Sequence, residues 1–253
     1  MLEAADLKKT DTVVEIGPGF GVLTLALAGR VEKVITFEIE QKLKPYWERL
    51  LEDQEIKGPR DQKIGKIEIL WGNVLHKLKN RSSDLPIFRS PYKVIANLPY
   101  QITSHVLRTL LESENKPESI TVMVQKEVAD RIVAKPGDMS LLSVSVQYYG
   151  KPKIVCKVPK GSFWPQPKVD STVVHISTRA RQHLSTFSDK EFFKVAKTGF
   201  ANKRKQLWHN LSEGLKIDKD KIKEILVEVV GSEKVRAQEL SVENWFDVVK
   251  LVT

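Results

Sequence analysis

Two short segments of the sequence carry residue types suited to holding a ligand and a planar amine. The first, Glu15–Gly21, reads Glu-Ile-Gly-Pro-Gly-Phe-Gly between a buried-strand pattern and a helical pattern. The second, Asn97–Tyr100, reads Asn-Leu-Pro-Tyr and directly follows a later strand pattern. The first can hold a ligand through backbone N–H groups, and the second can accept hydrogen bonds from an amino group.

The glycine loop indicates an adenosine-containing ligand when it is combined with Glu38. Gly17 and Gly19 let the backbone approach a ligand without a Cβ clash, and the following helix offers free N–H groups. Glu38 ends the next strand pattern, 21 positions after Gly17, where an acidic residue binds ribose hydroxyls in such folds. The loop alone is also compatible with a tight structural turn, which selects glycine too.

The spacing of the loop separates two cofactors. A dinucleotide site has the pattern G-x-G-x-x-G, whereas Gly21 makes this loop G-x-G-x-G. Glu15 can accept a hydrogen bond from an ammonium group, which S-adenosylmethionine carries and nicotinamide cofactors lack. The sequence therefore predicts S-adenosylmethionine, with Glu15, Gly17, Gly19 and Glu38 among its binding residues.

The Asn-Leu-Pro-Tyr segment suits the activation of an exocyclic amine. The lone pair of such an amine is delocalised into the base, and acceptors for both N–H groups turn it toward a methyl donor. Asn97 supplies a side-chain carbonyl oxygen, and Leu98–Pro99 can supply a backbone carbonyl oxygen in a segment stiffened by the proline ring. Tyr100 supplies an aromatic ring on which a base can stack. No general base is required before transfer. The alternative is an Asn-x-Pro turn that only ends a strand.

Strand and helix patterns alternate from Asp11 to about Thr178, which predicts an α/β fold with a mostly parallel sheet covered on both faces. Two later strand-like runs, Leu141–Tyr148 and Ser171–Ser177, lack a long helix between them and predict an antiparallel pair at one edge, which brings the sheet to seven strands. Two polar stretches, Asp53–Lys66 and Lys79–Arg89, are typical of surface loops. The expected parallel strands are Val13–Ile16, Lys33–Glu38, Ile67–Leu70, Tyr92–Ala96 and Ser119–Val124.

After about residue 179 the strand patterns stop. Three runs have apolar residues at helical spacing, namely Lys190–Thr198, Lys219–Val229 and Val242–Leu251, and Ser188 and Ser241 are suitable N-caps. We therefore predict a catalytic domain over residues 1–180 and a small all-α domain over residues 181–253.

Composition points to a protein of the cytoplasm with an anionic partner. The formal net charge is +9, which favours nucleic acid, although a basic surface can also be merely solvated. Cys156 is the single cysteine, which excludes an internal disulfide and suits a reducing compartment. No apolar run approaches the ~20 residues of a membrane span, and Met1–Asp6 lacks a signal-peptide pattern. The five histidines lack metal-ligand spacing, so no metal is predicted.

Several segments together resemble the family of small-subunit ribosomal RNA adenine N6,N6-dimethyltransferases. They are Val14–Gly19, Asn97–Tyr100, Met123–Ala129, Leu142–Val144 and Phe163–Ser171, the last similar to the family's F-x-P-x-P-x-V-D-S. The resemblance implies a Rossmann-like class I methyltransferase domain, S-adenosylmethionine as cofactor, and a monomer that dimethylates adenines near the 3′ end of small-subunit RNA in a pre-30S-type particle. It also implies that Phe163 sandwiches the target adenine against Tyr100.

The resemblance extends into the helical tail and has two departures. Lys203–Leu207 and Arg236–Leu240 are similar to the family's C-terminal domain, whose basic side chains dock on ribosomal RNA, although each such cation is equally compatible with a solvated helix face. The family usually begins with a segment containing Gly-Gln-Asn-Phe-Leu, whereas residues 1–7 match only the end of the following helix, so one wall of the site is expected to be missing. Asn73 stands where the family typically has the Asp that binds the cofactor's adenine, and Asn97 is expected to contact cofactor as well as substrate.

Two alternatives stay open. A related enzyme that modifies large-subunit RNA and confers antibiotic resistance has the same core, but Asn97–Tyr100 and Val169–Ser171 favour the small-subunit branch. A non-catalytic ribosome-assembly factor of the same fold is favoured by the missing first segment. A pure binder has no need to keep four residues together, which favours the enzyme; they are Glu38, Asn97, Tyr100 and Phe163.

Overall fold

The computed structural model describes residues 1–52, 65–79, 91–178 and 187–253. The two predicted polar loops therefore lie almost wholly outside the described residues. Contacts divide the chain into one unit formed by Met1–Ala129 and Lys151–Ala180 and a second formed by Asp130–Gly150 and Arg181–Thr253. The stretch Asp130–Gly150, which the sequence analysis grouped with residues 1–180, thus packs within the second unit.

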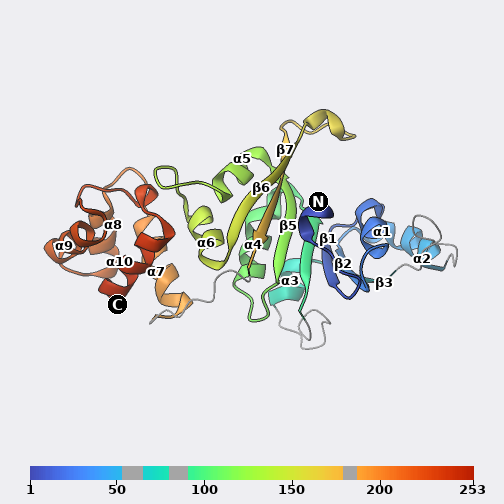
Figure 1. Cartoon of the computed structure of the whole chain (residues 1–253), viewed down its shortest axis with the longest axis horizontal. Helices are drawn as coiled ribbons and strands as arrows, with labels where there is room; N and C mark the ends of the chain where they lie inside the picture. Colours follow the sequence, from blue (N-terminus) through green and yellow to red (C-terminus); the bar gives the residue numbers. More distant parts are fainter. Residues whose placement is uncertain (53–64, 80–90, 179–186) are drawn as a thin grey trace. The chain divides into compact units, whose positions relative to one another are not determined.

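The first unit is built on a seven-stranded sheet with the order β3-β2-β1-β4-β5-β7-β6 (Figure 1). β1 to β5 pair in parallel, whereas β7 runs antiparallel to both β5 and β6. This arrangement confirms the predicted seven-stranded, mostly parallel sheet. The strands are β1 Thr12–Ile16, β2 Lys33–Glu38, β3 Lys66–Trp71, β4 Lys93–Asn97, β5 Ser119–Gln125, β6 Lys151–Val158 and β7 Ser171–Ser177.

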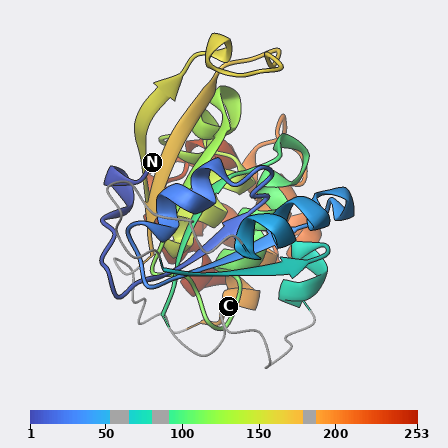
Figure 2. The same ribbon diagram turned by 90° about the vertical axis from the view of Figure 1, so that its right-hand side faces the viewer.

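The strand order reverses direction between β1 and β4, and this reversal determines where the helices lie. Right-handed crossovers place the helices of the β1-β2-β3 side and of the β4-β5 side on opposite faces of the sheet. Figure 2 views the sheet from the side of α1 and α2, drawn in blue. The helices are α1 Val22–Ala28, α2 Lys44–Glu52, α3 Val74–Lys79, α4 Thr103–Leu111 and α5 Lys126–Ile132, with 3-10 turns η1 Glu3–Ala5, η2 Gln41–Leu43, η4 Tyr100–Ile102 and η5 Lys160–Ser162.

The central strands are apolar on both faces because both faces are covered. Val13 and Val14 of β1 and Val94 and Ile95 of β4 are fully buried, as expected for parallel strands between two helical layers. The N-terminal turn η1 closes one end of this core, since Ala5 belongs to the same buried cluster as Val13 and Ile95.

An ion pair ties the start of the chain to the first residue of β4. Lys93 Nζ donates to the Asp6 carbonyl oxygen and lies 2.8 Å from Asp11 Oδ2. The same Asp11 oxygen accepts from the Lys8 backbone N–H. The Lys93 and Asp11 side chains are only 11% and 14% exposed, so water can replace little of this network if one partner is lost.

We expect Lys93→Met to lower the free energy of unfolding by about 2 kcal/mol, less than for a fully buried pair because some water still reaches both groups. The matched control is Lys33→Met, which removes a 2.7 Å pair with Glu68 whose side chains are 23% and 29% exposed. That change should cost under ~1 kcal/mol. Urea titration of both variants checks the prediction, and equal losses would contradict it.

The predicted strand over Leu141–Tyr148 is wrong, because this segment forms helix α6, Leu141–Tyr149. Ser140 and Ser143 form a reciprocal capping box that begins the helix. The alternation of apolar and polar residues suggested a strand, but packing of Tyr148 against Phe192 of the helical unit prevails. The edge partner of β7 is instead β6, a strand that the sequence analysis missed.

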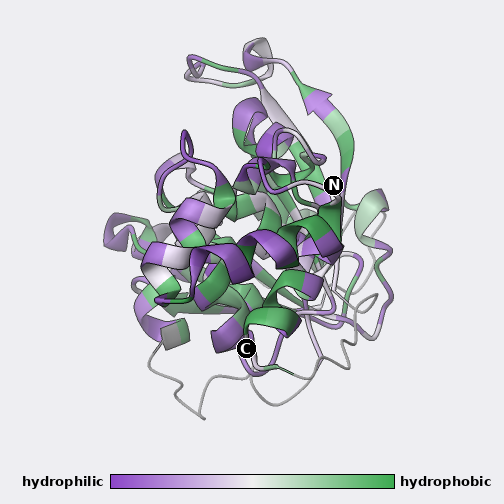
Figure 3. Cartoon of the chain, turned by 90° about the vertical axis from the view of Figure 1, so that its left-hand side faces the viewer, coloured by the Kyte–Doolittle hydropathy of each residue, from purple (hydrophilic) through white to green (hydrophobic). Residues whose placement is uncertain are grey.

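The second unit joins α6 to four further helices through aromatic packing. Figure 3 shows that these helices carry both hydrophilic and hydrophobic turns. Ser188 and Ser241 cap α7 and α10 as predicted, whereas α8 was not predicted. Asp189, in the first turn of α7, accepts hydrogen bonds from the hydroxyls of Tyr148 and Tyr149. The four helices are α7 Asp189–Gly199, α8 Leu207–Leu215, α9 Lys219–Val230 and α10 Val242–Val252, with the 3-10 turn η6 Ala237–Glu239.

Candidate active site

The glycine loop and the Asn-Leu-Pro-Tyr segment lie side by side. They follow β1 and β4, which are neighbouring parallel strands at the point where the strand order reverses. Open α/β sheets bind ligands at the carboxyl ends of such strands. A Cβ atom added to Gly17 would lie 4.0 Å from Pro99 Cδ, so the two motifs line one site.

Aromatic side chains of α2 hold the glycine loop in place. Trp47 Nε1 donates to the Gly19 carbonyl oxygen at 2.9 Å, and the Tyr46 hydroxyl donates to the Phe20 carbonyl oxygen at 3.0 Å. Gly21 has a φ of 81°, and an added Cβ would lie 2.7 Å from Trp47 Cη2. Neither aromatic residue was predicted from the sequence, because no motif connects them to a loop more than twenty positions away.

Gly21→Ala should disturb this loop through two effects, a left-handed φ and a steric clash. The φ alone costs about 1–2 kcal/mol, and Gly231→Ala is the matched control, since Gly231 has a φ of 75° and no atom within 4 Å of an added Cβ. We expect Gly21→Ala to lower the free energy of unfolding by at least ~1 kcal/mol more than the control and to weaken binding of the predicted cofactor. Thermal unfolding and dialysis of labelled S-adenosylmethionine measure both effects, and identical losses in the two variants would contradict the steric argument.

Glu38 connects the second strand to the glycine loop. Its two carboxylate oxygens accept from the backbone N–H groups of Gly19 at 3.2 Å and Glu40 at 2.7 Å. A carboxylate has about four acceptor sites, so this side chain stays able to accept from two hydroxyls of a ribose. The predicted position of Glu38 at the end of β2 is observed.

Glu15 is a buried carboxyl group beneath the loop. Its side chain is 1% exposed, and it accepts a 2.6 Å hydrogen bond from the Thr24 hydroxyl. Burial raises the pKa of Glu15 to about 7, the Thr24 hydrogen bond opposes this rise, and the negative charge of Glu38 adds to it. No ion pair to Glu15 occurs among the described residues. A cationic ligand group would therefore be favoured beside it, which fits an ammonium group.

Asn73 lies between β3 and α3 and directly precedes the helix. Its Oδ1 accepts from the Leu75 backbone N–H at 2.9 Å, so the amide oxygen acts as a helix cap. An amide oxygen has a second lone pair and can still accept from a ligand. Its position after the third strand places it at the same sheet edge as the glycine loop.

The Asn97–Tyr100 segment has one exposed amide between buried anchors. Asn97 is exposed, whereas Leu98 is buried and its N–H donates to the Met123 carbonyl oxygen at 3.3 Å. The Pro99 carbonyl oxygen accepts from Ile102 N–H and the Thr103 hydroxyl. Since this carbonyl starts the following helical turns, the Leu98 carbonyl is the better candidate to face a ligand.

Tyr100 and Phe163 both belong to the edge of the sheet at which the parallel strands end. The Tyr100 hydroxyl lies 2.9 Å from Ser171 Oγ, at the start of β7. Gln125, the last residue of β5, pairs with Ser171, so the β6–β7 hairpin turns beyond the carboxyl ends of the parallel strands. Phe163 is half-buried in that turn. Within the described part of the chain, no ring contact joins it to Tyr100, which leaves their sandwich a prediction.

Comparison with known proteins identifies the family. The profile of the family named Ribosomal RNA adenine dimethylase matches residues 1–253. The chain belongs to the ribosomal RNA adenine dimethylase family.

Relatives of known name agree with this assignment. The Ribosomal RNA small subunit methyltransferase A of Dehalococcoides mccartyi is 44% identical over 97% of this chain and 80% of its own length. The protein of that name from Clostridioides difficile is 38% identical over 97% of this chain and 82% of its own length. A dimethyladenosine transferase structure from Plasmodium falciparum is 25% identical, with a TM-score of 0.76 over 98% of this chain and 91% of that chain. The structure of the 23S rRNA methyltransferase ErmE shares the fold. It is 24% identical, with a TM-score of 0.74 over 99% of this chain and 94% of that chain.

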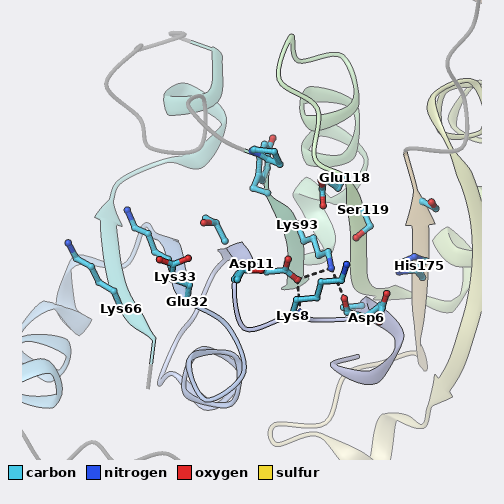
Figure 4. A pocket seen from close by; sticks show the side chains of 16 residues that line it. Asp6, Lys8, Asp11, Glu32, Lys33, Lys66, Lys93, Glu118, Ser119 and His175 are labelled. Carbon is cyan, nitrogen blue, oxygen red and sulfur yellow. Dashed lines mark hydrogen bonds and ion pairs between the residues drawn. The ribbon is translucent and has the colours of Figure 1, made fainter. Parts of the chain in front are cut away.

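This member of the dimethylase family also has a cavity of about 710 Å³ at the opposite edge of the sheet. Its lining includes the first residues of the five parallel strands, so it lies away from the glycine loop. Figure 4 shows acidic and basic side chains facing one another there, with Lys93 bonded to Asp6 and Asp11. His175 is part of the lining, and burial, followed by the charges of Lys153 and Lys93, lowers its pKa.

In the part of the chain that the structure describes, no helix has the length and apolar character needed to cross a membrane. Nor do any three His, Cys, Asp or Glu side chains in the described ranges come together as a possible metal-binding group.

Proposed function

We propose that this protein transfers two methyl groups from S-adenosylmethionine to the N6 amino group of adenines near the 3′ end of small-subunit ribosomal RNA, in the cytoplasm and during ribosome biogenesis. The observation that carries the proposal is the direct apposition of the two motifs, with Gly17 against Pro99. That apposition supports a site in which a nucleotide-type cofactor would lie next to an amine-binding segment.

The first half of the proposed site holds the cofactor. Glu38 binds the ribose hydroxyls, Glu15 favours the ammonium group, and the backbone at Gly17 and Gly19 allows close approach. Asn73 Oδ1 accepts a hydrogen bond from the adenine amino group through the lone pair that is not used by the Leu75 N–H. When bound, S-adenosylmethionine supplies an electrophilic methyl group.

The second half of the proposed site holds the target adenine. Asn97 Oδ1 and the Leu98 carbonyl accept from the two N–H bonds of the amine, and Pro99 fixes the backbone between them. Tyr100 stacks on one face of the base, and Phe163 stacks on the other face. A monomethylated amine still has one N–H bond for Asn97 or Leu98, which supports two successive transfers.

Small-subunit RNA is favoured over large-subunit RNA by the names of the relatives. Proteins 44% and 38% identical to this chain are named small subunit methyltransferase A, whereas ErmE is similar at the level of the fold. We propose that residues 1–180 bind S-adenosylmethionine and catalyse transfer, and that residues 181–253 dock on ribosomal RNA. The net charge of +9 supports a polyanionic partner, bound by a monomer.

The proposal is tested with labelled S-adenosylmethionine and three substrates, namely small-subunit particles lacking the modification, the same particles already modified, and protein-free large-subunit RNA. We expect label only in the unmodified small-subunit particles. Label in large-subunit RNA alone would favour the resistance-type enzyme. Particle binding without label would favour a non-catalytic assembly factor.

Asn73→Asp should strengthen cofactor binding about fivefold, because hydrogen bonds to a charged acceptor are worth ~1 kcal/mol more than neutral ones. Aspartate caps a helix as well as asparagine does, so stability should not change. Asn73→Ala is the control that removes both the cap and the acceptor. Calorimetric titration of the two variants measures the effect, and equal affinity in Asn73→Asp and the parent protein would remove Asn73 from the cofactor site.

A further inference from the structure

The turn between β6 and β7 presents one fully exposed tryptophan. Trp164 is 97% exposed, whereas the preceding Phe163 is half-buried. Phe163 has extended backbone angles, φ −121° and ψ 150°. Side chains of successive residues in an extended segment point to opposite sides. Trp164 therefore faces away from the side on which Phe163 meets the protein.

The backbone beneath Trp164 is held at both ends. The Asp170 carboxylate accepts from the Lys160 N–H at 2.9 Å, and the Asp170 carbonyl oxygen accepts from the Lys126 N–H at 3.0 Å. Pro165 and Pro167 restrict the chain between these anchors. The indole is thus presented from a constrained turn, so that a ligand stacking on it need not order a flexible loop.

The strand leading to this turn is strongly basic. Figures 1 and 2 both show the hairpin, in yellow, projecting beyond the rest of the sheet. Most of β6 is exposed. Residues 151–170 contain one acid, Asp170, and five lysines, which are Lys151, Lys153, Lys157, Lys160 and Lys168. An exposed aromatic ring flanked by cations is the combination that binds single-stranded nucleic acid, through base stacking and phosphate contacts.

We propose that Trp164 is a stacking platform for an unpaired base beside the target adenine, which sets the position of the RNA strand. This inference rests on the proposed function, since it takes ribosomal RNA as the partner. Phe163 and Trp164 would then hold two different bases, because their side chains diverge. A base stacked on Trp164 would position its neighbour at the Asn97–Tyr100 segment.

The test uses the full chain and an RNA stem-loop that carries the target adenines in an unpaired loop. Each nucleotide next to the targets is replaced in turn by an abasic one, and every RNA is titrated against the parent protein and Trp164→Ala. With the intact loop, Trp164→Ala should bind about 5- to 150-fold more weakly, the range for one lost base stack. At one abasic position the affinity of the parent protein should fall by a similar factor, compared with the intact loop. The affinity of Trp164→Ala should not fall further at that position, because the stacking contact is already lost.

Two control variants sharpen the result. Trp164→Phe keeps a stacking face and should recover most of the affinity. Lys168→Gln should reduce the salt dependence of binding without abolishing the effect of the abasic position, because a lysine contacts phosphate rather than a base. Thermal unfolding should be the same for all variants, since Trp164 is exposed.

The proposal is overturned if Trp164→Ala binds the stem-loop with an affinity within twofold of the parent. It is also overturned if, at every abasic position, Trp164→Ala weakens binding by the same factor as it does with the intact loop. Loss of binding to whole particles with unchanged stem-loop affinity would also overturn it, in favour of a protein surface as the partner. Methylation by the parent protein is measured in parallel. Absence of methylation of unmodified small-subunit particles rejects the proposed function, whereas the stacking result is decided by binding of the stem-loop alone.

Discussion

Asn97→Ala is expected to slow methyl transfer by about 10²–10³-fold, the loss seen when one preorganised hydrogen-bond partner of a reacting group is removed. Asn97 is exposed at the end of β4, so the substitution should leave the fold intact. The expected loss arises because the amine no longer has an acceptor that turns its lone pair toward the methyl donor. Single-turnover transfer to unmodified small-subunit particles measures the rate.

The control variant is Asn97→Asp, which keeps a side-chain oxygen in the same position. It should retain substantially more activity than Asn97→Ala, because the acceptor persists. Cofactor affinity should fall by less than tenfold in both variants, because Glu15, Glu38 and the glycine loop stay in place. A rate within threefold of the parent in Asn97→Ala would show that the side-chain carbonyl does not orient the amine.

Glu15→Gln is expected to remove a pH dependence of both stability and cofactor binding. The pKa of Glu15 is raised from 4.5 to about 7 in the folded protein. Between these values Glu15 is protonated in the folded state and ionised in the unfolded state. The contribution of this proton to the free energy of unfolding is therefore fully present below about pH 4.5 and is lost as pH rises to about 7. The total fall is about 3 kcal/mol. Glutamine does not titrate in this range. At pH 8 the unliganded variant should be more stable than the parent, because it does not bury a charged carboxylate.

Cofactor binding should show the opposite trend. A bound ammonium group favours ionised Glu15, so affinity for S-adenosylmethionine should increase as pH rises to about 7 and binding near pH 6 should release a proton. Calorimetry in buffers of different ionisation enthalpy measures this release. Glu15→Gln should bind more weakly and release none. Equal proton release by the variant would assign the titration to another group.

The sequence predicted the half of the fold in which local pattern and packing agree. The parallel strands, the glycine loop and the serine caps of α7 and α10 are all local signals, and each is present in the structure. The error over α6 arose because Val144-Ser145-Val146-Gln147-Tyr148 alternates as a strand does. Aromatic contacts with α7, which lies some forty residues later, select the helix instead.

The candidate site was predictable in its motifs but not in the residues that support them. Thr24 beneath Glu15 and Trp47 behind Gly19 act through hydrogen bonds across nine and 28 positions, and no spacing rule indicates such pairs. Ser171 carried a signal, since it ends the Phe163–Ser171 segment, yet its bond to the Tyr100 hydroxyl depends on the pairing of β5 with β7. Long-range register of this kind becomes visible only in the folded chain.

We propose that the apposed loops transfer methyl groups to the amino nitrogen of adenine. The most direct test is mass analysis of nucleosides from unmodified small-subunit RNA after incubation with the protein and isotope-labelled S-adenosylmethionine. We expect N6,N6-dimethyladenosine carrying two labelled methyl groups, formed about 10²–10³-fold more slowly by Asn97→Ala. Label on another atom, on another base, or on no nucleoside at all while cofactor and RNA both bind would contradict it.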